Sequence, residues 1–210
     1  SDLAASADNA IKRMCDIFTA LFGIILLTPL WIIVAAMVRL NDGGPAFFTQ
    51  ERVGLDGKTF TMFKFRTMRV DAEELKDSLM EANEADSSAG NSIMFKMAND
   101  PRITRIGAFL RKTSIDELPQ LFNVLRGDMS LVGPRPPLPS EVAQYEPRVM
   151  GKFAVRPGIT GLWQISGRSN LSWDETVHLD LSYAQHRSLT LDTWIMLQTI
   201  PALLRHEGAY

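Results

Sequence analysis

The most prominent pattern in the chain is an apolar run near its N-terminus. Residues 17–38 contain no charged side chain, and charged residues flank the run on both sides. A helix of this length would extend roughly 33 Å, which matches the ~30 Å hydrocarbon core of a bilayer. Pro29 lies in the middle of the run, where it removes a backbone hydrogen bond and bends a helix. The pattern fits a spanning helix, which the residues alone favour, or a hairpin that enters and leaves by one leaflet.

After this run, the polar and apolar positions predict a small β-hairpin. Residues 46–68 contain two strand-like stretches rich in Phe, Val and Thr, joined by Asp56-Gly57, a strong hairpin-turn signal. Lys64 and Arg66 lie in the second stretch. Either side chain could bind phosphate, although basic residues on edge strands also serve simply to prevent aggregation.

Helical periodicity dominates the rest of the chain. Apolar residues recur at helical spacing in residues 70–85, 103–112 and 191–204. The second of these helices carries several arginines and suits an anionic membrane surface, and the third has an apolar stripe suited to a membrane-facing position. Another helix is expected over residues 116–125, ended by Gly127. The pattern predicts a mainly helical α+β domain with amphipathic helices at a membrane interface.

Composition excludes several classes of protein and of site. The 210 residues suffice for one domain, and 22 basic against 24 acidic residues exclude the overall basicity typical of a nucleic-acid partner. The single cysteine, Cys15, excludes an intrachain disulfide and a cysteine-based zinc site. Residues 1–11 begin with Ser rather than Met and are mostly small and polar. They are expected to be a linker from an upstream region, which leaves residues 12–210 as the functional domain.

Candidate chemistry centres on Asp116 and Glu117, two adjacent carboxylates at the expected start of a helix. Taken alone, they fit a capping box with Ser114. Pro119 argues against that register, because it would delete an intrahelical bond, but it is tolerated in the first turn of a helix that starts near Asp116. Free backbone N–H groups there favour an ionised Asp and also phosphate. Asp116 is therefore the candidate nucleophile, with helix capping as the alternative.

Basic residues on both sides of this helix favour phosphate chemistry. Arg111 precedes the carboxylate pair, and Arg135 follows the helix between Pro134 and Pro136, which limit the freedom of the backbone. A guanidinium held in this way suits bidentate recognition of phosphate and is expected to be exposed to substrate. The alternative is a proline-rich connector with a solvated arginine.

Several motifs together resemble the bacterial sugar transferases known as monotopic phosphoglycosyl transferases. The motifs, in the order of that family, are Lys12-Arg13 with Asp16, Thr28-Pro29, Gly44 to Phe48, Lys64 to Met68, Asp116 to Gln120, and Gly133 to Pro136. Residues 156–168 resemble an extension found in the large members, which are similar to undecaprenyl-phosphate glucose or galactose phosphotransferases. Those members carry an upstream membrane bundle, so the resemblance implies that this chain is a fragment or a processed product.

The resemblance implies a specific reaction, the first membrane step of exopolysaccharide, capsule or O-antigen synthesis. Asp116 would attack the sugar-bearing phosphate of a UDP-sugar, with glucose or galactose favoured, and release UMP. Undecaprenyl phosphate would then accept the sugar phosphate from the aspartyl intermediate. Mg²⁺ is the implied ion, with Asp116 and Glu117 as its ligands. Glu117 would assist metal binding or proton transfer.

Further site residues follow from the same resemblance. Arg111 and Arg135 match family positions near the phosphates. Gln164 and Arg168, in a predicted strand–turn segment, are expected to contact uridine or diphosphate. Ser172 and Glu175 predict a capping box at the start of the next helix.

The resemblance also changes the expected topology. It implies a re-entrant helix hairpin over about residues 12–40, with Thr28 where the family commonly has Ser, and an active site on the cytoplasmic face of the bacterial inner membrane. The partners implied are the UDP-sugar, undecaprenyl phosphate, membrane lipid and a second copy in a homodimer. Two other classes remain: a metal-dependent nucleotide-sugar phosphatase or hydrolase, and a single-pass adaptor without activity.

Overall fold

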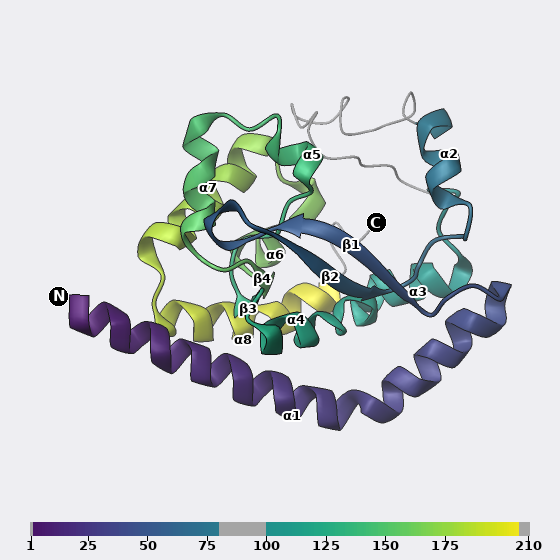
Figure 1. The fold of residues 1–210 in the computed structure, drawn as a ribbon, viewed down its shortest axis with the longest axis horizontal. Helices are drawn as coiled ribbons and strands as arrows, with labels where there is room; N and C mark the ends of the chain where they lie inside the picture. Colours follow the sequence, from purple (N-terminus) through teal and green to yellow (C-terminus); the bar gives the residue numbers. More distant parts are fainter. Residues whose placement is uncertain (1, 80–99, 206–210) are drawn as a thin grey trace.

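One long helix, α1 (Asp2–Asp42), runs along one side of the remaining chain (Figure 1). The computed structural model describes residues 2–79 and 100–205. These residues are mainly helical and include two small sheets, which confirms the predicted α+β class dominated by helix. Residues 1–11, expected to form a linker, are helical from Asp2 onward and belong to α1.

α1 is continuous but curved (Figure 1), and Pro29 lies inside it. Because Pro29 has no N–H, it leaves the carbonyl of Ile25 without its helical donor. The Thr28 hydroxyl does not replace that donor, since it donates to the carbonyl of Ile24 at 2.7 Å. Such a side-chain bond to the preceding turn favours bending. In place of the two separate arms expected of a hairpin, the structure has one bent helix.

One side of α1 contributes to the main hydrophobic core. The ring of Trp31 lies 6.5 Å from that of Phe65 and 5.4 Å from that of Phe122. The other sides expose large apolar side chains, and 17% of the most apolar stretch of α1 is buried. By length and composition α1 is able to cross a membrane. The buried residues of this shared core are Ala20, Trp31, Val34, Val38, Met62, Phe65, Leu110, Leu121, Val124 and Met129.

The predicted β-hairpin is present. β1 (Phe47–Val53) and β2 (Thr59–Phe65) are antiparallel, and Asp56 and Gly57 at the turn have φ angles of 57° and 73°. These left-handed conformations suit Asp and Gly, as the sequence indicated.

A second, parallel pair of strands was not predicted. β3 (Ser130–Val132) pairs with β4 (Gly158–Thr160), and Ser130 lies opposite Gly158. With three residues in each strand, the alternation that indicates a strand has no room to develop. A Cβ added to Gly158 would lie 2.0 Å from the backbone nitrogen of Gly133, so glycine permits this close approach. The tight pairing shapes one wall of the pocket described below.

α3 (Arg105–Thr113) packs closely against the segment that follows β2. Thr104 caps the helix by accepting a hydrogen bond from Gly107 N at 2.9 Å. A Cβ added to Gly107 would lie 1.9 Å from the carbonyl oxygen of Thr67, so only glycine fits there. One turn later, Arg111 Nε lies 2.9 Å from Thr67 Oγ1. The glycine contact therefore sets the position of Arg111.

The candidate carboxylates lie in a short turn rather than in a helix. α3 ends at Ser114, which has φ of 58°, and the 3-10 turn η3 (Ile115–Glu117) and Pro119 follow before α4 (Gln120–Arg126). The helix expected from residue 116 therefore begins later, at Gln120. The Ser114 side chain caps neither element, so the capping-box alternative is wrong. Gly127 ends α4 with φ of 91°, as predicted.

The C-terminal helices follow their predicted patterns. α7 (Trp173–His186) begins with the expected capping box, in which Ser172 N donates to the Glu175 carboxylate at 2.8 Å and Glu175 N donates to Ser172 Oγ at 3.2 Å. α8 (Leu189–Arg205) was predicted over residues 191–204 and exposes apolar side chains such as Trp194. The other helical elements of the described residues are η1 (Leu55–Gly57) at the hairpin turn, α2 (Ala72–Leu79), α5 (Pro139–Val142), η4 (Pro147–Ala154), α6 (Leu162–Ile165) and η5 (Arg168–Asn170).

Two predicted segments differ from the structure or extend beyond the described residues. The helix expected over residues 70–85 is present as α2, and its part beyond residue 79 lies outside the described residues. The strand–turn segment expected for Gln164 is instead the short helix α6, which begins directly after β4 with Gly161 as its extended N-cap residue.

Candidate active site

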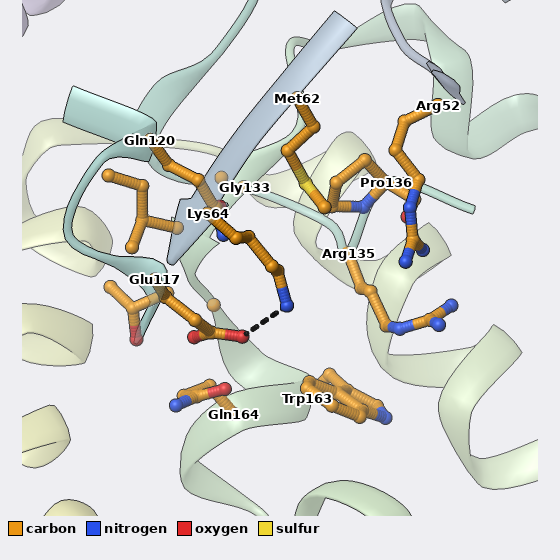
Figure 2. A pocket seen from close by; sticks show the side chains of 14 residues that line it. Arg52, Met62, Lys64, Glu117, Gln120, Gly133, Arg135, Pro136, Trp163 and Gln164 are labelled. Atoms are coloured by element: carbon orange, nitrogen blue, oxygen red, sulfur yellow. Dashed lines mark hydrogen bonds and ion pairs between the residues drawn. The ribbon is translucent and has the colours of Figure 1, made fainter. Parts of the chain in front are cut away.

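A pocket of about 100 Å³ opens between η3, β2, the loop after β3, and α6. Lys64 and Glu117 line one side of it, and Arg52 and Arg135 line the opposite side (Figure 2). Other side chains and glycines of its wall are Met62, Gln120, Gly133, Pro136, Trp163 and Gln164. The pocket therefore brings together groups from β1, β2, η3 and α6 that lie far apart in the sequence.

Of the two adjacent carboxylates, Glu117 faces the pocket and Asp116 is buried beside it. Lys64 Nζ lies 3.3 Å from Glu117 Oε1 (Figure 2). Asp116 is 6% exposed. The two side chains diverge because successive residues of a 3-10 turn point about 120° apart. The structure thus gives the neighbouring carboxylates different surroundings.

Burial raises the pKa of Asp116 to about 6, because the ionised carboxylate loses its hydration. Lys64 lowers this pKa, the adjacent Glu117 raises it, and Arg111 lowers it again. Desolvation outweighs the neighbouring cations, so the pKa of Asp116 is raised rather than lowered by its surroundings. At neutral pH, Asp116 is still ionised, but its charged form is less stable than it would be in water.

Arg111 and Arg168 do not line the pocket, but both guanidinium groups interact electrostatically with the two carboxylates. Burial lowers the pKa of both guanidinium groups, and the negative charges of Asp116 and Glu117 oppose that shift. Arg168 Nη2 donates to Ser114 Oγ at 3.2 Å. The Gln164 amide oxygen, in the orientation its neighbours require, accepts from Arg168 Nε at 3.1 Å. Gln164 and Arg168 thus meet at the edge of the site.

Arg135 lines the pocket but is not a freely solvated group. Its Nη1 lies 3.1 Å from a carboxylate oxygen of the buried Glu141, and its guanidinium lies 5.8 Å from the ring centroid of Trp163. Burial raises the pKa of Glu141, but Arg135, the Leu138 N–H and the charge of Arg52 together outweigh it, and the net shift is downward. The expectation of an exposed arginine is therefore corrected: 24% of the side chain is exposed. The proline-rich loop presents Arg135 already oriented by a carboxylate.

The structure does not bring Arg66 into this pocket. Arg66 follows the end of β2, and its Nη1 and Nη2 bind both carboxylate oxygens of Asp42 at 2.7 and 2.5 Å. Its Nε donates to the carbonyl of Pro45 at 2.6 Å. Arg66 therefore fastens the end of α1 to the β-hairpin, and its prediction as a substrate-binding residue is not supported by its position.

The sequence did not indicate Arg52, which lines the pocket, or Glu141, which lies behind the lining and binds Arg135. Arg52 is buried on β1, opposite Phe60 of β2, and Glu141 is buried on α5 beneath Arg135. The position of Arg52 at the end of a predicted strand could have indicated a special role, because a charged residue is almost never fully buried unless it is paired. Glu141 offered no local signal, since its role depends on the loop that carries Arg135.

Comparison with known proteins places this site in a family. The sequence profile described as bacterial sugar transferase matches residues 7–206. The chain belongs to this family. The match includes α1 from Ala7 onward, the β-hairpin and all of the pocket residues, so the resemblance found in the sequence motifs is confirmed.

Several curated bacterial sugar transferases are similar to the chain. Galactosyl transferase CpsE of Streptococcus agalactiae serotype III is 48% identical over 199 residues, which cover 94% of this chain and 43% of that protein. Undecaprenyl-phosphate galactose phosphotransferase of Salmonella typhimurium is 43% identical over 210 residues, 100% of this chain and 44% of that protein. Exopolysaccharide production protein ExoY of Rhizobium meliloti is 41% identical over 199 residues, 95% of this chain and 88% of that protein. The chain thus spans less than half the length of the first two relatives.

The carboxylate pair of this sugar transferase fits a magnesium ion only in part. No group of three or more His, Cys, Asp or Glu side chains suited to a metal occurs within residues 2–79 and 100–205. Mg²⁺ commonly takes one or two protein carboxylates and completes its shell with substrate phosphates and water. Glu117 at the pocket and Asp116 beside it match that ligand set. The site therefore fits Mg²⁺ together with a phosphate-bearing substrate.

Proposed function

We propose that the chain transfers a sugar 1-phosphate from a UDP-sugar to undecaprenyl phosphate and releases UMP. The observation that carries this proposal is the carboxylate pair Asp116 and Glu117, set among Lys64, Arg111 and Arg168 at a pocket lined by further arginines. The names of similar transferases from Salmonella typhimurium and Xanthomonas campestris, which specify galactose or glucose and undecaprenyl phosphate, support it.

The proposed reaction has two displacements at one phosphorus. In the first, an Asp116 carboxylate oxygen bonds to the sugar-bearing phosphorus, and the phosphoanhydride bond breaks so that UMP leaves with the electron pair. In the second, an oxygen of undecaprenyl phosphate attacks the same phosphorus, and the bond to Asp116 breaks. Covalent catalysis in this form never requires the two large substrates to react with each other directly.

Positive side chains make these displacements between anions feasible. Lys64 and Arg111 are the cations that lower the pKa of Asp116, so both are close enough to offset charge on a transferring phosphoryl group. Glu117 and Asp116 would hold Mg²⁺, which when bound supplies further charge neutralisation at the phosphate oxygens. Glu117 is otherwise available to move a proton at the edge of the pocket.

The decisive test follows UMP release and adduct formation in the purified chain. With a UDP-sugar and no acceptor, we expect one equivalent of UMP and a mass increase of one sugar phosphate on Asp116. Adding undecaprenyl phosphate should restore turnover. Continuous UMP release without acceptor would favour the alternative hydrolase, and no release with any UDP-sugar would favour the adaptor. The same assay with UDP-glucose and UDP-galactose identifies the donor.

The pH dependence of the first step should report the unusual environment of Asp116. A protonated carboxylic acid is not a nucleophile, so UMP release should decline as pH falls through the raised pKa of Asp116, which is near 6 without metal and which bound Mg²⁺ would lower. Single-turnover UMP release between pH 4.5 and 8, without acceptor and over a series of Mg²⁺ concentrations, measures this, because the ionisation of the lipid phosphate then plays no part. A rate that stays constant down to pH 4.5 at the lowest Mg²⁺ concentration that supports release would contradict the raised pKa.

We also propose that α1 enters and leaves the membrane on the cytoplasmic side of the bacterial inner membrane. The bend at Pro29 and the packing of both halves of α1 onto the shared core support this arrangement. A spanning helix would place most of α1 in the bilayer, away from the core residues of β2 and α4 that it contacts.

Cysteine labelling at the two ends of α1 tests this topology. Asp8→Cys and Asn41→Cys, each in a Cys15→Ser background, place exposed thiols on either side of the apolar stretch. An impermeant maleimide added to intact spheroplasts should label neither, and both should react after lysis. Labelling of only one site in intact spheroplasts would establish a spanning helix. The Cys15→Ser background alone gives the blank.

A further inference from the structure

Arg52 is a buried guanidinium with no acidic partner in contact. It is 9% exposed, and within residues 2–79 and 100–205 no carboxylate lies within ion-pair distance of it. Its Nη1 donates to the Pro136 carbonyl at 2.9 Å, and Nε and Nη2 donate to Gln50 Oε1 at 3.1 and 2.6 Å. An arginine has five N–H groups, so three hydrogen bonds leave two without a partner in the described chain. Such a group is expensive to bury without a purpose.

Arg52 and Arg135 share one counter-ion. Both guanidinium groups lower the pKa of Glu141. Arg135 forms an ion pair with Glu141, whereas Arg52 attracts this carboxylate from a longer distance. Burial and, to a smaller extent, the charge of Arg135 lower the pKa of Arg52 to about 9. Two like charges against one carboxylate leave this wall of the pocket one positive charge in excess. An anion bound between the two arginines would remove that excess.

The position of Arg52 favours a water-soluble anion over a lipid one. β1, which carries Arg52, packs on β2 and α5, whereas α1 packs on α3, α4 and β3. Arg52 and Arg135 also lie across the pocket from Lys64 and Glu117 (Figure 2). A donor whose sugar-bearing phosphate lies at the carboxylates would therefore extend its other phosphate toward the arginines, on the side away from the apolar helix.

We propose that Arg52 and Arg135, oriented by Gln50 and Glu141, form an anion subsite for the nucleotide-side phosphate of the donor, the phosphate that departs with UMP. Arg52 contributes two free N–H groups, and Arg135 contributes the N–H groups that Glu141 does not occupy. The identity of the nucleotide rests on the proposed function, but the binding of a nucleoside monophosphate is tested separately from transfer. The subsite holds the leaving group and forms no covalent bond.

Gln50→Glu is the sharpest test of this subsite. The substitution keeps the shape and the oxygen that accepts from Arg52, and it adds a negative charge that neutralises the guanidinium. A purely structural arginine should tolerate this change or gain stability from it. A phosphate-binding arginine should lose UMP affinity by at least about tenfold, as expected when a charged hydrogen bond is lost. Gln144→Glu, which adds the same charge at an exposed position of the chain, is the matched control.

The measurement is calorimetric titration of the full chain in nanodiscs with UMP, with uridine and with a short-chain prenyl phosphate. We expect Gln50→Glu and Arg52→Lys to weaken UMP binding while leaving uridine and prenyl phosphate binding unchanged. Thermal melting identifies a variant that does not fold. If Arg52→Lys does not fold, the titrations of Gln50→Glu alone decide the proposal. Wild-type UMP affinity in a folded Gln50→Glu variant would overturn the proposal, and so would a selective loss of prenyl phosphate binding.

Failure of the subsite is distinguishable from failure of the proposed function. If the wild-type chain releases no UMP from any UDP-sugar, the transferase proposal fails while the UMP titrations still decide the role of Arg52. If transfer occurs but Gln50→Glu binds UMP normally, only the subsite fails.

Discussion

Asp116→Asn is expected to abolish UMP release and adduct formation while making the protein more stable at pH 7.5. Asparagine keeps the size of the side chain but has no anionic oxygen to attack phosphorus. Loss of a covalent nucleophile commonly reduces turnover by on the order of 10⁴-fold or more. We therefore expect activity at the background of the assay.

The gain in stability follows from the raised pKa. A carboxylate with pKa about 6 in the folded state and 3.8 as its ordinary value binds its proton more tightly when folded. Its contribution to stability is fully present below the lower value and is lost as pH rises through the higher one. At pH 7.5 the ionised, buried Asp116 thus costs on the order of 2–3 kcal/mol, which the neutral amide avoids.

Urea unfolding of wild type and Asp116→Asn between pH 4 and 8, without divalent metal, checks this prediction. The difference in unfolding free energy should grow between about pH 4 and 6 and then level off. Asp8→Asn, at an exposed position of α1, is the control and should change neither stability nor rate. An Asp116→Asn variant that still transfers sugar phosphate would show that Asp116 is not the nucleophile.

Arg135→Ala is expected to lower both activity and stability. The variant loses a charged contact at the pocket, worth about ten- to hundredfold in UMP release if the contact tightens in the transition state. It also leaves Glu141 buried with its partner removed, which costs about 2 kcal/mol or more for a pair of this partial exposure. The sequence alone indicated a guanidinium exposed to substrate, whose loss would lower turnover more than stability, and the ion pair with Glu141 changes that balance.

Two companion variants separate these effects. The double variant Arg135→Ala/Glu141→Gln removes the stranded charge and should recover most of the stability without recovering the rate. Arg135→Lys keeps a positive charge near Glu141 but loses the planar fork, so it should be stable and slow. Melting temperature and single-turnover UMP release measure the two properties. Full activity in Arg135→Ala would return this residue to the role of a loop connector.

The features that could be predicted from the sequence are those encoded locally. The apolar run predicted α1, Asp56-Gly57 predicted the turn of the β-hairpin, and Ser172 with Glu175 predicted the start of α7. In each case, neighbouring residues interact with one another, so a short stretch contains the whole signal.

The features that could not be predicted depend on contacts between distant segments. Arg66 lies outside the pocket because Asp42, at the end of α1, binds its guanidinium. Arg52 lines the pocket instead, where it donates to the loop after β3. The raised pKa of Asp116 follows from burial that local sequence does not reveal. The pairing of β3 with β4 likewise comes from two three-residue strands in separate parts of the chain.

The packing of Trp31 against Phe65 and Phe122 has a consequence for how members of this family can diverge. A membrane anchor joined by a flexible tether can be exchanged between proteins as a module. α1 cannot, because its inward residues complete the same core as β2 and α4. Its substitutions must be matched by compensating changes across that core, so chimaeras that graft a relative's α1 onto this chain would need the facing side chains grafted with it.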